Sequence, residues 1–122
     1  MSIGQRYIDF INPKNVQTYF KNPELLFSQQ VRKVVNSAQL VHNINELVEQ
    51  MQDVTQKYGV VAVNLLDLIE AKDNTINVIR FEITYVDHTV DCVIAILKGN
   101  KQGLIYEIND VFGEKAAYDW KS

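Results

Sequence analysis

The sequence contains few cysteines and histidines, the residues that form disulfide cross-links and many metal sites, and it contains no long apolar run. Its single cysteine, Cys92, excludes a disulfide within the chain, and its two histidines lie before a predicted helix and in a predicted turn. We therefore predict no metal site and no cofactor. No apolar run approaches the roughly eighteen residues of a membrane-spanning helix, and the opening segment MSIGQRYIDF does not resemble a signal peptide. These absences favour a cytoplasmic protein that does not contact membranes.

Positive charge is also scarce and scattered. The chain has 12 Lys and Arg residues against 15 Asp and Glu residues, a formal net charge of -3, and Arg32-Lys33 is its only adjacent basic pair. Such a surface does not favour nucleic acid, so no nucleic-acid partner is predicted. The glycines of the KGNKQG segment join two predicted strands instead of opening a helix, so the sequence predicts no phosphate-binding loop.

The apolar content is sufficient for one globular core. Hydrophobic residues make up 47% of the 122 residues, and no repeat or low-complexity segment divides the chain. The sequence therefore predicts a single domain over residues 1–122.

Helical patterns occupy the first half of the chain. Residues 3–11 and 15–27 each predict a short helix, the second one interrupted at Pro23. The clearest helix follows in NINELVEQMQDVTQKYG, where Asn43 and Glu46 have the spacing of a capping box and Gly59 supplies a stop. These signals predict a long helix over about residues 43–59.

Alternating patterns dominate the second half. After a short strand at 31–35, four strands are predicted at about 60–71, 75–85, 89–98 and 104–112. Their connections are too short to hold crossover helices, so the four strands must be antiparallel neighbours. Helices followed by one curved antiparallel sheet indicate an α+β domain with the helices on one sheet face.

Three segments carry a family resemblance when taken with this order of elements. They are GQRYIDFIN, LLFSQQVRKVVNSAQLVHNINELVEQM and GLIYEINDVFGE. Together they resemble the nuclear transport factor 2-like superfamily over residues 1–114, and the last segment resembles its SnoaL-like polyketide cyclase and ketosteroid isomerase branch. The resemblance implies a cone-shaped fold, in which the sheet curls around the long helix and leaves an apolar pocket open at one end.

The resemblance also bears on individual residues. Steroid-converting members use a tyrosine on the first helix, an acidic residue on the penultimate strand and an Asp near the first strand. Tyr7 matches the tyrosine, but the other positions fall on Val93 or Ile94 and near Val35. Steroid isomerisation by that set of residues is therefore not expected.

One acidic residue interrupts an apolar face of the last predicted strand. Strand alternation places Asp110 with Leu104, Tyr106, Ile108 and Phe112. The polyketide-cyclase-like branch has an acidic base on its last strand, and Asp110 falls at that position. The resemblance thus implies Asp110 as a general base, whereas strand-end position alone favours a carboxylate solvated at the rim or capping a backbone group.

Aromatic residues outline the predicted ligand site. We expect Phe81, Tyr106 and Phe112 to line a cavity together with Tyr7, which would donate a hydrogen bond; a fully packed core is the alternative. Asp91 also shares an apolar face and is a further candidate, although its place at a strand entrance is the simpler explanation. The predicted ligand is a small apolar or carbonyl-containing molecule.

Two functional classes remain open at this point. The first is a cofactor-independent isomerase, lyase or cyclase, or a binder, with Asp110 as base. The second is a non-catalytic association module of the same fold. Because both faces of the 89–98 strand are apolar, with Val90, Cys92, Ile94 and Ile96 facing away from the predicted core, we also predict a homodimer that pairs through the sheet.

Overall fold

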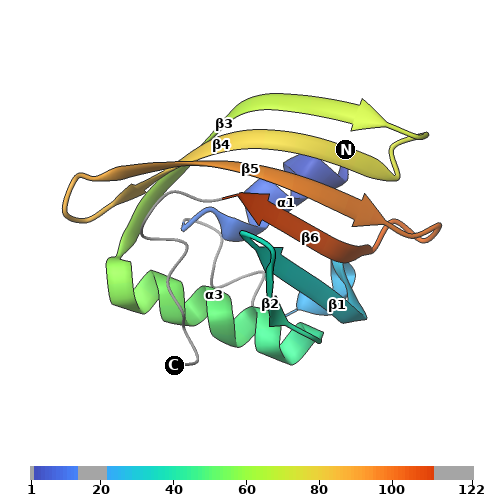
Figure 1. Cartoon of the computed structure of the whole chain (residues 1–122), viewed down its shortest axis with the longest axis horizontal. Helices are drawn as coiled ribbons and strands as arrows, with labels where there is room; N and C mark the ends of the chain where they lie inside the picture. The colour runs from blue at the N-terminus through green and yellow to red at the C-terminus, as the bar shows by residue number, and fades with distance from the viewer. Residues whose placement is uncertain (1, 14–21, 112–122) are drawn as a thin grey trace.

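The computed structural model describes residues 2–13 and 22–111, which form helices and one curved sheet (Figure 1). The elements in chain order are α1 (Ile3–Ile11), the 3₁₀ turn η1 (Pro23–Leu25), β1 (Phe27–Val35), β2 (Ala38–Val41), α3 (Ile44–Tyr58), β3 (Val60–Ala71), β4 (Ile76–Tyr85), β5 (Val90–Gly99) and β6 (Ile105–Val111). Within the described residues this is a mixed α+β architecture, as predicted.

Local capping interactions define both ends of helix α3. At the start of α3 the Asn43 side chain accepts a hydrogen bond from the Glu46 backbone N–H at 2.9 Å, and the Glu46 carboxylate accepts one from the His42 backbone N–H. The helix ends at Tyr58 because Gly59 adopts the left-handed conformation, with φ of 65°. Helix α3 thus spans Ile44–Tyr58, between the Asn43 cap and the Gly59 stop.

The sheet has six strands in the order β2-β1-β6-β5-β4-β3. Strands β3 to β6 form the predicted antiparallel meander. Strand β1 then runs parallel to β6, which places Lys33 beside Ile108 and Val35 beside Asp110. This parallel pairing joins an early strand to the last described strand of the chain, and alternation within either strand could not predict it.

The second predicted helix is only partly testable and is wrong where the structure describes it. Residues 14–21 lie outside the described residues, and Pro23 opens a short 3₁₀ turn instead of continuing a helix. Strand β1 already begins at Phe27, which pairs with Ile105, and so it is longer than the predicted strand at 31–35. Pairing with β6 extends the strand beyond its β-branched segment.

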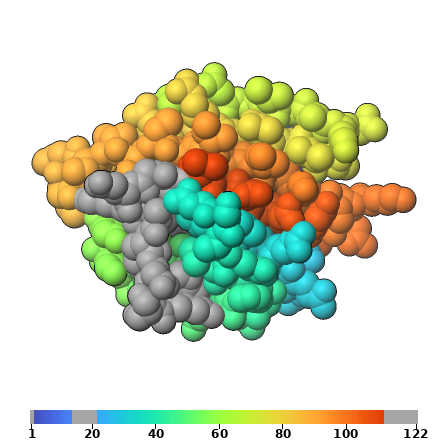
Figure 2. Space-filling view, viewed as in Figure 1, coloured from blue at the N-terminus to red at the C-terminus, as the bar shows by residue number. Residues whose placement is uncertain are grey.

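The hydrophobic core lies between the inner face of the sheet and the two helices. In Figure 2 the strands lie in front of α1 and hide it from view. The side chains that α1 contributes include Phe10, whose ring packs edge-on against Phe27 with centroids 4.8 Å apart. Fully buried apolar side chains on the strands include Ile79, Phe81 and Leu97, each of which stabilises the fold by roughly 1.5–3 kcal/mol.

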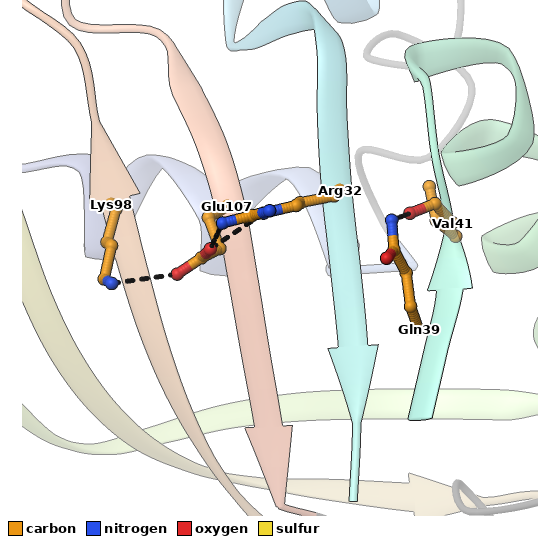
Figure 3. A network of polar contacts seen from close by, with 5 residues as sticks. All are labelled: Arg32, Gln39, Val41, Lys98 and Glu107. Carbon is orange, nitrogen blue, oxygen red and sulfur yellow. Dashed lines mark hydrogen bonds and ion pairs between the residues drawn. The ribbon is translucent and has the colours of Figure 1, made fainter. Parts of the chain in front are cut away.

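Polar side chains connect strands β1, β6 and β5 on the outer face. Glu107 accepts hydrogen bonds from the Arg32 Nε at 2.8 Å and from Lys98 at 3.0 Å, as Figure 3 shows. Burial opposes ionisation of Glu107, but the bonds from Lys98 and Arg32 outweigh it and hold the pKa of Glu107 below its usual value. This network therefore links the strands from the side opposite the core.

Candidate functional site

The carboxylate of Asp110 is fully buried on the inner face of the sheet. Asp110 lies on β6 between Val35 on β1 and Ala95 on β5, and its side chain has 0% exposure. The expectation of a carboxylate solvated at the rim is wrong, because neighbouring strands flank Asp110 on both sides. Its inward orientation, predicted from strand alternation with Ile108, is confirmed.

The same alternation fails at Tyr106. Gly99 pairs with Ile105 while Lys98 pairs with Glu107, so β6 holds one extra residue at this point. Tyr106 occupies this bulge and is 40% exposed. It does not share the buried face with Asp110, and the predicted common face is wrong for this residue.

A buried lysine stands next to Asp110. Lys33 on β1 is 4% exposed, and its Nζ lies 3.7 Å from the Oδ2 of Asp110. The same nitrogen donates a hydrogen bond of 2.9 Å to the Oε1 of Gln50, a buried residue of α3. Sequence analysis missed Lys33, although its alternation with Val31 and Val35 placed it on an apolar face.

Tyr7 reaches the same region from α1. Its side chain is buried, and its ring packs edge-on against Phe27 at a centroid distance of 6.2 Å. Burial raises the pKa of Tyr7 well above its usual value, and the negative charge of Asp110 raises it further. Tyr7 is therefore a protonated hydroxyl at neutral pH, and its pKa responds to the charge of Asp110.

Burial and mutual attraction act in opposite directions on the Lys33–Asp110 pair. Burial raises the pKa of Asp110 to about 6, against a lowering effect of Lys33. Burial also lowers the pKa of Lys33, against a raising effect of Asp110. Burial thus moves the pKa of both groups toward their neutral forms, and each partner opposes that shift in the other.

The oxygens of Asp110 lack hydrogen-bond donors. Within the part of the chain that the structure describes, neither Oδ1 nor Oδ2 has a hydrogen-bond partner, and the 3.7 Å separation from Lys33 is longer than a normal hydrogen bond. Leaving a buried polar group in this state costs about 1–3 kcal/mol. The two oxygens therefore keep unused capacity to accept hydrogen bonds.

The remaining predicted site residues lie on other strands or outside the described residues. Phe81 is buried on the inner face of β4. Asp91 is half-buried on β5 and accepts a hydrogen bond of 3.0 Å from the hydroxyl of Tyr85, which gives it a structural role. Phe112 lies outside the described residues. Among residues 2–13 and 22–111, no group of three His, Cys, Asp or Glu side chains could hold a metal ion.

Comparison with known proteins identifies the fold. No protein-family model matches the sequence, and no curated protein matches it either. A SnoaL-like family protein from Agrobacterium tumefaciens matches with a TM-score of 0.76 and 13% identity over 92% of this chain and 95% of its own. A SnoaL-like protein from Jannaschia matches with a TM-score of 0.75 and 10% identity over 90% of this chain and 82% of its own.

A third structure extends this agreement. A nuclear transport factor 2-like protein of unknown function from Exiguobacterium matches with a TM-score of 0.72 and 17% identity over 93% of this chain and 99% of its own. The chain has the nuclear transport factor 2-like fold. Within this nuclear transport factor 2-like domain, Val35 and Val93 are buried apolar residues, and the buried acid stands on β6 at Asp110. No helix among the described residues is long and apolar enough to cross a membrane.

Proposed function

We propose that this domain binds a small, mainly apolar carbonyl compound in its interior, in the cone-shaped arrangement of the nuclear transport factor 2-like fold, and that Asp110 moves a proton on that compound. The observation that carries the proposal is the buried Asp110 carboxylate, whose two oxygens have no hydrogen-bond partner among the described residues. A protein keeps such a destabilising group where binding or catalysis uses it.

The geometry supports general acid–base chemistry without a cofactor. A carboxyl group with a pKa of about 6 is partly ionised near neutral pH and can take a proton from the carbon next to a carbonyl. The Tyr7 hydroxyl, kept protonated by burial, would donate a hydrogen bond to the oxygen that becomes negative. An isomerase, lyase or cyclase reaction needs these two roles.

The similar structures add support at the level of chemical class. The proteins from A. tumefaciens and Jannaschia carry proposed activities as an isomerase and as a polyketide cyclase, respectively. Both names describe chemistry on small organic molecules. Phe81 and Tyr7 would supply the apolar walls for such a ligand in this chain.

Exchange of hydrogen for deuterium in a probe ketone tests the proposal. We expect the protein to accelerate deuterium uptake next to the carbonyl of 2-tetralone in heavy water, followed by NMR. Asp110→Asn should slow the protein-dependent rate by about 100-fold or more. Asp67→Asn is the matched control, because Asp67 is an exposed carboxylate of the same sheet. A wild-type rate equal to that of buffer, or an unchanged rate in Asp110→Asn, would contradict the proposal.

A second role, association through the sheet, is favoured by a separate observation. Strands β5 and β6 lie at the surface in Figure 2, and they carry large exposed apolar side chains. They are Val90 (50% exposed), Ile94 (45%), Ile96 (38%), Tyr106 (40%) and Val111 (59%). We propose that a second copy of the chain covers these side chains, with the ion pairs around Glu107 at the rim of the interface.

Light scattering tests this association. We expect a homodimer at micromolar concentration, and Ile94→Glu should convert it to a monomer without unfolding it, since Ile94 is 45% exposed. Val61→Glu on β3 is the control, because Val61 is also exposed but lies on another strand. A wild-type protein that is entirely monomeric would rule out the dimer.

A further inference from the structure

We propose that Lys33 is a covalent binding site, at which the side-chain amine condenses with the carbonyl group of an apolar aldehyde or ketone to form a Schiff base, with Asp110 as the proton carrier. This inference rests on the proposed function only in requiring that a carbonyl compound enters the interior. It adds a nucleophile, a covalent bond and a substrate class to that function.

The first requirement of such a site is an uncharged amine. Lys33 is 4% exposed, whereas a lysine normally keeps its ammonium group in water. Burial disfavours the ammonium form and lowers the pKa of Lys33. A desolvated lysine of this kind is a stronger nucleophile at neutral pH than an exposed lysine.

The second requirement is that the amine is held in place. The Lys33 Nζ donates a 2.9 Å hydrogen bond to the Oε1 of Gln50, which projects from α3 across the core. This contact fixes the end of a side chain that is otherwise flexible. Gln50 is thus a positioning residue for the nitrogen.

The third requirement is a group that moves protons at the nitrogen. Asp110 lies 3.7 Å from the Lys33 Nζ and lacks hydrogen-bond donors among the described residues. Burial shifts the pKa of each group toward its neutral form, which lowers the free-energy difference between the ion pair and the neutral pair. In the neutral pair Asp110 carries the proton and the Lys33 amine is uncharged.

The condensation then balances within this pair. The amine nitrogen attacks the carbonyl carbon, the carbon–oxygen π electrons move to oxygen, and the nitrogen proton passes to that oxygen, giving a carbinolamine. The Asp110 carboxyl protonates the hydroxyl, the carbon–oxygen bond breaks, and water leaves. The product is a protonated imine at Lys33 beside an ionised Asp110, with no change in oxidation state.

The net charge of the Lys33–Asp110 pair and the apolar side chains of the core limit the chemical class of the ligand. The Lys33–Asp110 pair is neutral as a whole, so it does not favour a ligand with a permanent charge. The side chains of Tyr7 and Phe27, whose rings pack edge-on against each other, are aromatic and buried, and they suit an apolar or aromatic body. The expected class is therefore uncharged aldehydes and ketones with an aromatic or aliphatic body.

Reductive trapping tests the inference directly. The full chain is incubated at pH 7 with benzaldehyde and sodium cyanoborohydride, which converts an imine to a stable secondary amine, and the labelled lysine is located by peptide mass spectrometry. We expect Lys33 to gain one benzyl group at least about 10-fold faster than the exposed lysines, because burial disfavours the ammonium form of Lys33. Equal labelling of Lys33 and the exposed Lys72 and Lys101 would overturn the inference.

Variants provide the second measurement. Lys33→Met should abolish the fast labelling, while the matched control Lys101→Met, in an exposed turn, should leave it unchanged. If Lys33→Met does not fold, as judged by circular dichroism, Asp110→Asn replaces it: slower labelling of Lys33 in that variant supports the proton-carrier role, and an unchanged rate overturns it.

The deuterium exchange of 2-tetralone separates this inference from the proposed function. Exchange that is fast in the wild type without any trapping at Lys33 would overturn the Schiff base and leave Asp110 as a simple base. Trapping at Lys33 without exchange would support the lysine site while contradicting proton abstraction by Asp110. Failure of both measurements would overturn both.

Discussion

The side-chain nitrogen of Lys33 lies 3.7 Å from a carboxylate oxygen of Asp110, across the parallel strands β1 and β6. The two residues lie on strands that are far apart in the sequence, and they meet inside the core. Burying the charge of either side chain costs free energy, and the opposite charge of the partner reduces that cost. An isolated charge in a protein interior is far less stable than a paired one.

Removal of one member of this pair should cost more than removal of both. Lys33→Met leaves the Asp110 carboxylate buried without a cation, and we expect a loss of about 3–5 kcal/mol in the free energy of unfolding. The double variant Lys33→Met, Asp110→Leu should be less destabilised than the single variant. Urea denaturation of the wild type, both single variants and the double variant measures the coupling, and additive losses would show that the two residues do not interact.

The stability difference between wild type and Asp110→Asn should depend on pH. Asp110 has a folded-state pKa of about 6 against an ordinary value of 3.8, so the folded state binds this proton more tightly than the unfolded state. The contribution of Asp110 is therefore fully present below the unfolded pKa of 3.8 and is lost as the pH rises through the folded pKa of about 6. We expect the wild type to lose about 3 kcal/mol relative to Asp110→Asn across this window. A difference that stays constant with pH would refute the burial effect.

Glu107 should show the opposite dependence. Its pKa is held below the usual value in the folded state, so its contribution to stability is present above the unfolded pKa and is lost as the pH falls through the folded pKa. Glu107→Gln should cost about 1–3 kcal/mol at pH 7, because it weakens the bonds from Arg32 and Lys98. Chemical denaturation should show this cost shrinking under acidic conditions, and a cost that grows instead would reverse the assignment.

Gly4 should not tolerate a side chain. A Cβ atom at this position would lie 2.6 Å from Leu68 Cδ1 and 2.8 Å from Ile79 Cγ2. Because α1 sits directly on the sheet here, we expect Gly4→Ala to reduce the unfolding free energy by about 1–3 kcal/mol. Leu68→Ala in the same chain should recover part of this loss by making room, as thermal or urea unfolding would reveal; an absence of recovery would mean that the helix moves instead.

Local patterns predicted those parts of the fold that depend on local contacts. The capped helix α3 and the meander from β3 to β6 follow from side-chain periodicity and short connections, both of which are contained in neighbouring residues. The start of β1 at Phe27 and its parallel pairing with β6 depend on a partner far along the chain. No periodicity within 22–35 carries that information.

The candidate site was predictable to the same extent. Alternation correctly placed Asp110 on the inner face, but it cannot register the extra residue that turns Tyr106 outward. Lys33 was overlooked because a charged side chain is rarely buried without a partner, and that partner, Asp110, is brought beside it only by the pairing of β1 with β6. The signal available in the sequence was the alternation of Lys33 with Val31 and Val35, which places a charged residue on the same strand face as two valines.

The pairing of β1 with β6 also has a consequence for the order of folding. Arg32 and Glu107, which join these strands, are 75 positions apart, whereas the successive hairpins from β3 to β6 need only short turns. Contacts between distant segments form more slowly because a long loop must close first. We therefore expect the meander to form early and β1 to dock late, so that the Lys33–Asp110 pair is assembled in one of the last steps. During synthesis the interior pair cannot exist until β6 has left the ribosome.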